Sequence, residues 1–391
     1  MKLINKKLCN RNECTGCSAC VNVCPKKAIT LQYDDRGFLS PVVDEKKCIN
    51  CNMCTRLCEK LKNHMNDDKR KKSFYKVYAC KLKDEKKRMQ SQSGGLFTAL
   101  AETILEENGV VYGAGIDENN HVKHFRITKM EELGILKGSK YVQSDINNSF
   151  KMVIKDLQSN KAVLFSGTPC QVAGIESLLD FKKINKEKFY SCDLICHGVP
   201  SPKVYENYIS FLETRKGDKI KKFNFRDKDV NGWKEHVETY RFENSLDNRI
   251  ASKLYCELFY SNLILRKSCE SCKYASKKRP GDITMADFWG IEKINPELWN
   301  DNKGISACLI QTNHGEHLFE LAKDKLDVYE IKSKKYTQNN MEHPSYTPYQ
   351  KDNFWNDYKM LSFEKLLKKY TTYGGIKFKI KRKIYKKLNR W

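Results

Sequence analysis

Eight cysteines near the N-terminus are the residues whose types and spacing most clearly indicate chemistry. They form two runs of the pattern Cys-x2-Cys-x2-Cys-x3-Cys, and Pro25 follows the first run. Three thiolates at two-residue intervals let the backbone curl round one face of an iron–sulfur cubane, and the fourth ligand comes from the other run. The spacing therefore predicts two 4Fe-4S clusters. The expected ligands are Cys14, Cys17, Cys20 and Cys58 for the first cluster, and Cys48, Cys51, Cys54 and Cys24 for the second.

Zinc and disulfides fit this pattern poorly. Tetrahedral zinc sites use two separated pairs of Cys or His, whereas here four cysteines fall within eleven residues. The first six residues lack the apolar stretch of a secretory leader, and no segment has the roughly 18 apolar residues of a membrane span. We therefore expect a cytoplasmic protein whose cysteines, 17 in all, bind metal rather than form cross-links. The segment resembles a two-cluster ferredoxin domain.

The chain is strongly basic, with 72 Lys and Arg against 48 Asp and Glu and a net charge of +24. Two oxidised clusters lower this only modestly, because each cubane with its four thiolates carries about two negative charges. The charge favours acidic partners, phosphorylated cofactors or anionic lipid. Because no zinc-finger, RNA-recognition or helix-turn-helix pattern accompanies it, we expect no nucleic acid partner.

The rest of the 391 residues is long enough for a second, larger domain. We expect the cluster module at 1–65, a charged linker at 66–75 and the larger domain at 76–335, in two parts that meet near residue 150. Strand patterns at 75–80, 110–114, 162–165 and 189–195 alternate with helix patterns at 96–108, 171–179 and 202–214. The predicted fold class is α/β: an α+β module, then an α/β domain with a mostly parallel sheet.

Four further cysteines lie where such a sheet puts chemistry. Cys170 and Cys196 each follow a predicted strand, and they emerge at one carboxyl edge if these strands are neighbours. Cys269 and Cys272 form a C-x2-C pair on a loop. The four could ligate a third cluster, some could be buried core thiols, or Cys170 could be a redox-active thiol. The cysteines expected in the core are Cys9, Cys80, Cys192, Cys256 and Cys308.

Five motifs of the larger domain together resemble the coenzyme F-420 hydrogenase/dehydrogenase beta-subunit family. They are Ser-Gly-Gly-Leu-Phe-Thr at 93–98, Gly-Ser-Lys-Tyr-Val-Gln-Ser at 138–144, Gly-Thr-Pro-Cys-Gln at 167–171, Cys-His-Gly-Val-Pro-Ser at 196–201 and Asp-Ile-Thr-Met-Ala-Asp-Phe-Trp-Gly at 282–290. The resemblance covers roughly residues 75–315, with the ferredoxin domain in front as in many members. The family comprises iron–sulfur flavoproteins that pass electrons between a two-electron carrier and clusters.

The resemblance implies a bound FAD. Its candidate contacts are Ser93, Gly94, Gly95, Gly138, Ser139, Lys140 and Tyr141. A glycine pair that opens the helix at Leu96 could bring backbone amides to a phosphate, although Ser93 could equally be a helix N-cap. His197 is expected to be structural or a hydrogen-bond donor. No catalytic residue is identified.

The function that follows is that of an iron–sulfur flavoprotein oxidoreductase or electron-transfer subunit. It would move electrons between a two-electron carrier or substrate, FAD and the 4Fe-4S clusters. The expected partners are coenzyme F-420 or a nicotinamide as the carrier, and a redox protein at the ferredoxin domain. The alternative is a non-enzymatic iron–sulfur accessory protein of surface polysaccharide biosynthesis without a functional flavin site.

The last segment, 336–391, is expected to be a basic tail. Residues 376–391 contain eight Lys or Arg and no acid, and Ile376, Ile380, Ile384 and Leu388 recur every four residues. This pattern predicts an amphipathic helix. The helix either binds an anionic membrane surface, which would make the protein peripheral at the inner face, or remains solvated or docked on a partner.

Overall fold

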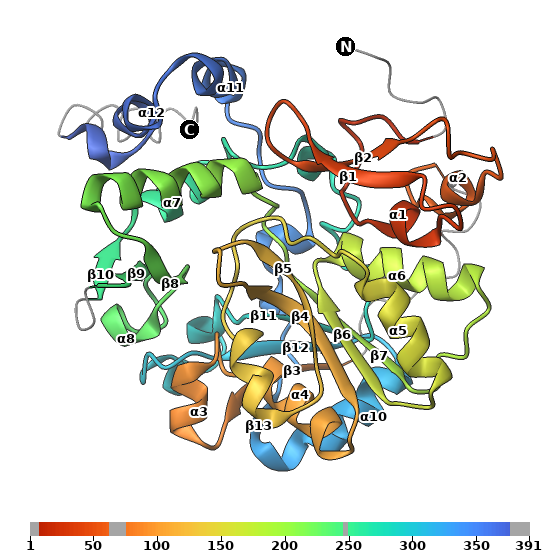
Figure 1. Cartoon of the computed structure of the whole chain (residues 1–391). Coiled ribbons are helices and arrows are strands. Elements are labelled where there is room, and N and C mark those ends of the chain that lie inside the picture. Colours follow the sequence, from red (N-terminus) through yellow and green to blue (C-terminus); the bar gives the residue numbers. More distant parts are fainter. Residues whose placement is uncertain (1–7, 62–75, 245–248, 376–391) are drawn as a thin grey trace.

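The computed structural model describes residues 8–61, 76–244 and 249–375, which form three parts (Figure 1). Residues 8–61 are the N-terminal module, a sheet of eight strands forms the centre, and a smaller lobe surrounds three short strands. The expected linker at 66–75 and the expected amphipathic helix at 376–391 lie outside the described residues. Within the described part of the chain, no helix combines the length and apolar character needed to cross a bilayer.

The central sheet has a parallel middle and antiparallel sides. Its four middle strands, β11, β7, β6 and β4, run in one direction, and β3 shares that direction, whereas β12, β13 and β5 run the opposite way. This confirms the predicted α/β class with a mostly parallel sheet. In spatial order the strands are β13 (Leu326–Glu330), β3 (Lys76–Leu82), β12 (Ser306–Ile310), β11 (Ile283–Asp287), β7 (Phe189–Leu194), β6 (Val163–Gly167), β4 (Val110–Ile116) and β5 (Val122–Ile127).

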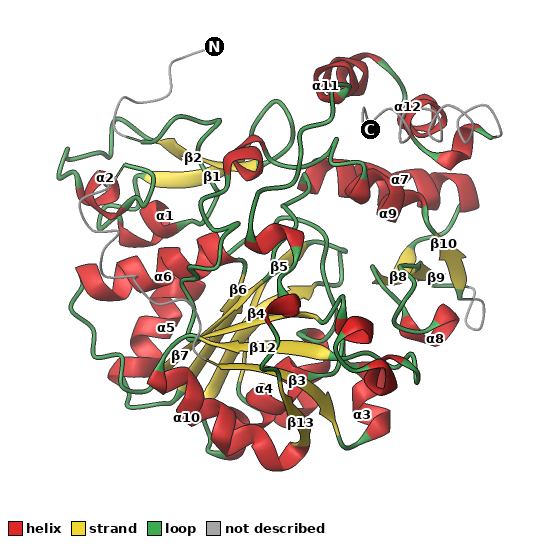
Figure 2. Cartoon of the chain, turned by 180° about the vertical axis from the view of Figure 1, so that it is seen from behind, coloured by secondary structure: helices red, strands yellow, loops and turns green. Residues whose placement is uncertain are grey.

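Helices bury both faces of the sheet, because successive side chains of each strand point to opposite faces. In β4, Val111 packs into the core on one face, whereas Val110 and Tyr112 pack into the core on the other. The helices α4 (Leu96–Glu106) and α10 (Asn313–Ala322) cover the first face. The helices α5 (Ser149–Gln158) and α6 (Pro169–Phe181) cover the second (Figure 2).

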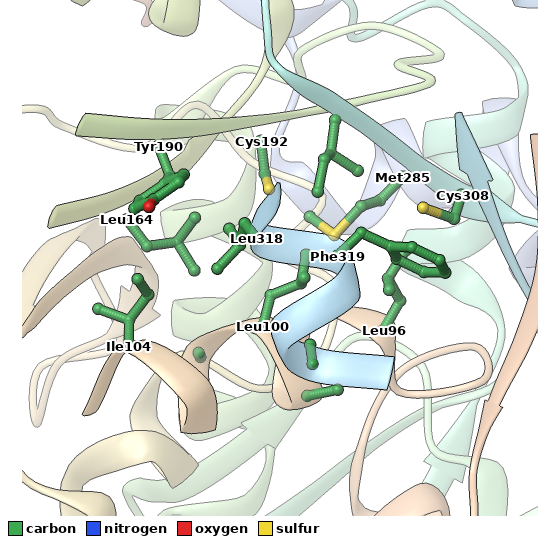
Figure 3. Close-up of a cluster of buried hydrophobic side chains, with 14 of the residues drawn as sticks. Leu96, Leu100, Ile104, Leu164, Tyr190, Cys192, Met285, Cys308, Leu318 and Phe319 are labelled. Atoms are coloured by element: carbon green, nitrogen blue, oxygen red, sulfur yellow. The ribbon is translucent and has the colours of Figure 1, made fainter. Parts of the chain in front are cut away.

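The first face contains the apolar cluster of Figure 3, in which α4 and α10 pack against the strands. The labelled side chains are Leu96, Leu100, Ile104, Leu164, Tyr190, Cys192, Met285, Cys308, Leu318 and Phe319. Cys80, Cys192 and Cys308 are fully buried in this cluster, as expected for core residues. They lie far from the carboxyl edge of the parallel strands only in the sense that no hollow described below includes them.

The predicted strand and helix segments agree with the structure. The segments at 76–80, 110–114, 162–165 and 189–195 correspond to β3, β4, β6 and β7, and the three predicted helices correspond to α4, α6 and α7 (Pro202–Lys216). Strands β6 and β7 are parallel neighbours, with Gly167 opposite Asp193. Cys170 and Cys196 therefore do emerge at the same edge of the sheet.

The N-terminal module lies beside α5 and α6 (Figure 1). It consists of the short helices α1 (Ala19–Val23) and α2 (Met53–Leu57) and the antiparallel hairpin of β1 (Ile29–Tyr33) and β2 (Leu39–Val43). Ala19 and Val23 of α1 and Leu57 of α2 are buried in the same apolar core as α5 and α6. The module is thus packed on the central sheet domain rather than tethered to it.

The smaller lobe has its own apolar core, which the end of the described chain completes. Its elements are α7, β8 (Ile220–Asn224), α8 (Lys228–Asn231), β9 (Glu238–Phe242), β10 (Ile250–Ser252), α9 (Leu254–Tyr260), α11 (Lys351–Met360) and α12 (Phe363–Tyr370), while α3 (Glu85–Gln90) follows β3. Phe354 of α11 and Leu367 of α12 are fully buried against α7. Residues 336–375 of the segment expected as a tail are therefore part of this folded lobe.

Candidate functional site

The two cysteine runs fold in the same way. Each third cysteine lies in a five-residue helix, α1 or α2, that follows a residue in the left-handed conformation: Ser18 with φ 64° and Asn52 with φ 57°. Each helix ends at the fourth cysteine, with φ −67° and ψ 113° at Cys24 and φ −67° and ψ 115° at Cys58. This single turn of helix carries the fourth thiol away from the first three.

The first hollow encloses about 610 Å³, part of it open to solvent. Its wall contains Cys14, Cys17 and Cys20 of the first run together with Cys58 of the second. The structure thus brings together the four residues expected to ligate the first cluster, including the one contributed by the other run. Burial raises the pKa of the Cys17 thiol to about 12.

Cys9 is a fifth thiol of the first hollow that the sequence did not identify. It is buried, as expected of a core residue, but it is hydrogen-bonded to Cys14 and Cys58. Chiefly because of these hydrogen bonds, the pKa of Cys14 falls to about 6 and that of Cys58 to about 7. Such surroundings favour the thiolate, which is the form that binds metal. Cys9 was missed because it has no companion at ligand spacing.

The thiols expected to ligate the second cluster lie nearer the surface. Cys51 is exposed, and Cys24, Cys48 and Cys54 are half-buried. The backbone amide of Ala28 donates a hydrogen bond to Cys24 Sγ at 3.3 Å, a contact of the kind that tunes cluster sulfurs. These four thiols line neither the first hollow nor the second hollow described next.

The second hollow encloses about 450 Å³ at the carboxyl edge of the parallel strands. Its wall brings together the four thiols considered for a third cluster, Cys170, Cys196, Cys269 and Cys272. Cys170 lies in the first turn of α6, Cys196 follows β7, and the other two belong to the turn at 267–272. The amide of Val199 donates a hydrogen bond to Cys269 Sγ at 3.4 Å.

The chemistry of this donor set fits an iron–sulfur cluster. Burial, together with the neighbouring thiols, raises the pKa of Cys170 to about 12 and that of Cys269 to about 11. Buried thiols of this kind become thiolates when cationic iron replaces their protons. Among the described residues, no three His, Cys, Asp or Glu side chains are grouped as a single metal ion requires. The grouping of four thiols round one hollow therefore suits a multi-iron cluster better than a zinc ion.

Helix α6 forms a wall common to both hollows. Cys170 lines the first hollow and the second hollow. One turn later, Gly174 lies so close to the N-terminal module that a Cβ atom there would be 3.2 Å from Cys17 Cβ and 3.3 Å from Cys17 Sγ. The two groups of thiols are thus separated by little more than one side chain.

Arg266 fixes the N-terminal module on the central domain. Its buried guanidinium donates to the carbonyl of Cys14 at 2.7 Å and to Ser40 Oγ at 2.9 Å, and it lies 5.3 Å from the centre of the Phe38 ring. Gln143 adds a reciprocal pair of 3.0 Å hydrogen bonds with the backbone of Leu39. Arg266 was not predicted, since its partners lie more than 200 residues away in sequence.

The Ser93–Gly95 turn, expected to contact a flavin, uses its backbone groups within the protein. Gly94 N donates to Ser306 Oγ at 2.9 Å, and Gly95 N donates to the carbonyl of Gln92. A Cβ atom at Gly94 would lie 2.1 Å from the Cys80 carbonyl oxygen, so the glycine is required for close packing on β3. Ser93 Oγ donates to the Ile305 carbonyl. It makes no side-chain cap of α4, which begins after Gly95.

The second candidate flavin segment, 138–141, is less constrained. Gly138 has φ 83° and open space around it, and Ser139 is half-buried. Lys140 Nζ donates to the carbonyls of Ile135 and Lys137, and burial lowers its pKa to about 7. The Tyr141 ring stacks on Phe259 at 4.4 Å. The segment lines neither hollow, so it does not meet the Ser93–Gly95 turn there.

His197 lies in the wall of the second hollow beside Cys196. Its Nε2 is 2.6 Å from Asn262 Oδ1, and the Asn262 amide nitrogen donates to the carbonyl of Tyr346. Since that amide group fixes its oxygen towards the ring, His197 donates from Nε2 and is held in one orientation. Burial lowers the pKa of His197. The expectation of a hydrogen-bond donor in a structural role agrees with these contacts.

Comparison with known sequences identifies the family. Residues 77–151 match the N-terminal part of the coenzyme F420 hydrogenase/dehydrogenase beta subunit, and residues 160–335 match its C terminus. The chain belongs to this family. Residues 13–60 match the 4Fe-4S dicluster domain. No curated protein sequence matches the chain.

Solved structures include one related complex. The F420-reducing [NiFe] hydrogenase complex from Methanosarcina barkeri, determined with xenon derivatization, contains a chain of 18% sequence identity. The alignment covers 66% of the present chain and 82% of that chain, with a TM-score of 0.46. The family matches identify the present chain as an iron–sulfur oxidoreductase or electron-transfer subunit of the beta-subunit type.

Proposed function

We propose that this beta-subunit-type chain binds three 4Fe-4S clusters and one FAD, and moves electrons between a two-electron carrier and a protein partner of the N-terminal module. The observation that carries the proposal is the position of Cys170, which lines both hollows. A cluster held by Cys170 in the second hollow would adjoin the cluster of the first hollow. The clusters would then form a continuous path from the carboxyl edge of the sheet to the protein surface.

The surroundings of the three thiol groups suggest a direction along this path. Cys170 and Cys269 are buried deep in the protein, the first hollow is partly open, and Cys51 is exposed. Bound FAD would supply the step that side chains cannot perform, the exchange of an electron pair for single electrons. The chain's own residues would hold the clusters close together and exclude water from the inner ones. Coenzyme F-420 or a nicotinamide would be the two-electron carrier.

The related hydrogenase is described as a complex, and we propose a partner subunit or redox protein for the present chain as well. We also retain cytoplasmic location and contact of residues 376–391 with an anionic membrane face as proposals. The latter segment carries eight basic residues and no acid. Deletion of these residues should abolish binding to phosphatidylserine vesicles at low salt if the contact exists.

One observation favours the alternative of an iron–sulfur accessory protein without flavin. The amides of Gly94 and Leu96, which a flavin phosphate would need, both donate to Ser306 Oγ. A phosphate would have to displace this hydroxyl. In the alternative, the clusters would serve a non-enzymatic role in surface polysaccharide biosynthesis.

Anaerobic purification with iron, sulfide and flavin quantitation separates the two functions. About twelve irons and one FAD per chain would support three clusters and the oxidoreductase. About eight irons without flavin would instead favour the accessory role. A screen of reduced F-420 and NAD(P)H as donors, followed through cluster bleaching, would then identify the carrier.

The variant Cys170→Ser tests the third cluster directly. It should lower the iron content by about four if Cys170 is a ligand. Unchanged iron, with loss of electron transfer between donor and clusters, would instead indicate a redox-active thiol. Cys256→Ser is the matched control, because Cys256 is a buried thiol that lines neither hollow.

A further inference from the structure

The surface around the second set of thiols has a composition that differs from the rest of the N-terminal module. Two segments carry these thiols, 24–28 and 44–56, and the amide of Asp44 donates to the carbonyl of Ala28, which joins them. They expose five cations and one acid. These residues are Lys26, Lys27, Lys46, Lys47, Arg56 and Glu45. We call the five cations the basic rim.

Most of the basic rim is not neutralised by the protein itself. Lys47 pairs with Asp44 at 3.2 Å, and the Arg56 guanidinium lies 5.3 Å from the centre of the Phe181 ring. No carboxylate of the described residues forms an ion pair with Lys26, Lys27 or Lys46. Three adjacent lysines therefore present their full charge to an approaching molecule.

Within the basic rim lies an exposed apolar and redox-active centre. Ile49 is 57% exposed, and Cys51 is the one exposed thiol among all 17 cysteines, each of which lies in the described residues. An apolar centre inside a charged rim is the usual anatomy of a protein–protein interface. Here the centre is also the point at which a cluster would come closest to the surface.

We propose that the basic rim is the docking surface for a small acidic electron-transfer protein, which exchanges electrons with the second cluster across Ile49 and Cys51. The inference rests on the proposed role of the N-terminal module as the port for a protein partner and specifies that partner's chemistry. Opposite charges steer such a partner and raise its association rate, while the small apolar contact permits rapid release. One electron passes from a reduced cluster to the partner's oxidised centre, and no proton or bond change is required.

The test uses the holoprotein with its clusters reduced by dithionite and then desalted, so that no flavin reaction is involved. The probe is a small acidic 2Fe-2S ferredoxin, and the second-order rate constant of electron exchange is measured by stopped flow at increasing salt. The rate constant should fall steeply with ionic strength. With basic cytochrome c as the acceptor, it should rise with ionic strength instead, since like charges repel.

Charge reversal separates the basic rim from the protein's overall charge. The variant Lys26→Glu/Lys27→Glu/Lys46→Glu should lower the rate constant with ferredoxin about ten- to a hundred-fold at low salt. The control variant Lys86→Glu/Lys221→Glu/Lys222→Glu makes the same change in net charge at α3 and β8, on the far side of the molecule from the N-terminal module (Figure 1). It should lower the rate constant less than three-fold, a rough limit for distant, screened charges.

Equal effects of the two triple variants would overturn the proposal, because only the overall charge would then matter. Loss of binding to phosphatidylserine vesicles in the first variant, with an unchanged ferredoxin rate, would also overturn it in favour of a lipid surface. Iron content and cluster absorption report on folding in every variant. Clusters that fail to form or to accept electrons in the unmodified chain would contradict the proposed function itself, which is a distinguishable result.

Discussion

The two cysteine runs have the same spacing and nearly the same backbone, yet they lie in opposite surroundings. The thiols of the first hollow are enclosed by α6 and held through Arg266, whereas Cys51 of the second set is open to solvent. The helices α1 and α2 differ by only a few degrees at their first and last residues. The difference shows that the motif determines which atoms bind iron, while packing against the rest of the chain determines what each cluster can reach.

The largest effect should come from removing one crossed ligand from each set. Cys58→Ser should remove the first cluster and Cys24→Ser the second, each with a loss of about four irons. The cluster that survives in Cys58→Ser is the exposed one, so ferricyanide should oxidise it several-fold faster than the survivor in Cys24→Ser. Iron analysis and stopped-flow oxidation measure both effects. Equal oxidation rates would contradict the difference in exposure.

The next effect concerns the contacts that enclose the first cluster. Arg266→Ala should destabilise the protein by about 3 kcal/mol, because it leaves the Cys14 carbonyl and Ser40 Oγ without a buried charged donor. The counterpart on the other side is Arg56→Ala, which removes only an exposed cation–π contact worth about 1 kcal/mol or less. Urea unfolding of the holoprotein, followed by tryptophan fluorescence and cluster absorption, compares the two. Similar losses would mean that the two sides are held equally.

A smaller, kinetic difference should appear on exposure to oxygen. We expect iron to be lost in two phases, with the second cluster lost several-fold faster, because Cys51 is exposed. Electron paramagnetic resonance at the end of the fast phase should show the first cluster intact. Loss of all iron in a single phase would indicate that the clusters are coupled or equally accessible.

The smallest effect should come from Gly174→Ala. Alanine favours the helix by about 1 kcal/mol, but its Cβ would lie 3.3 Å from Cys17 Sγ. The net change in unfolding free energy should therefore stay within about 1 kcal/mol, while the spectrum of the first cluster alone shifts. Gly134→Ala is the control, since its Cβ would meet no atom within 4 Å. A shift of the second cluster would contradict the contact at α6.

Local sequence was sufficient for the cysteine runs and for the parallel middle of the sheet. The spacing of Cys14 to Cys58 predicted the ligand groups, and the strand-turn positions of Cys170 and Cys196 predicted their common edge, because parallel strands end on the same side. Interactions between distant segments could not be predicted in this way. Neither the Arg266 contacts nor the pairing of β12 and β13 with β3 leaves a pattern in neighbouring residues.

The same limit applies to the flavin segment. The sequence Ser93-Gly94-Gly95 before a helix is typical of a phosphate-binding turn. Its glycine is nevertheless explained by the close approach of β3, and its amides by Ser306, more than 200 residues later. A motif alone cannot distinguish amides that await a ligand from amides that already have a partner.

The order of the thiols along the chain has a consequence for biosynthesis. All ligands of the N-terminal module are translated within the first 58 residues, so an assembly factor can load these clusters while the ribosome is still at work. The second hollow needs Cys170, Cys196 and Cys272, and its wall is closed by Pro344 and Ser345. Iron must therefore enter that site after residue 272 has emerged and before the segment at 340–345 packs over it. Maturation of the inner cluster is bound to a late and brief stage of folding.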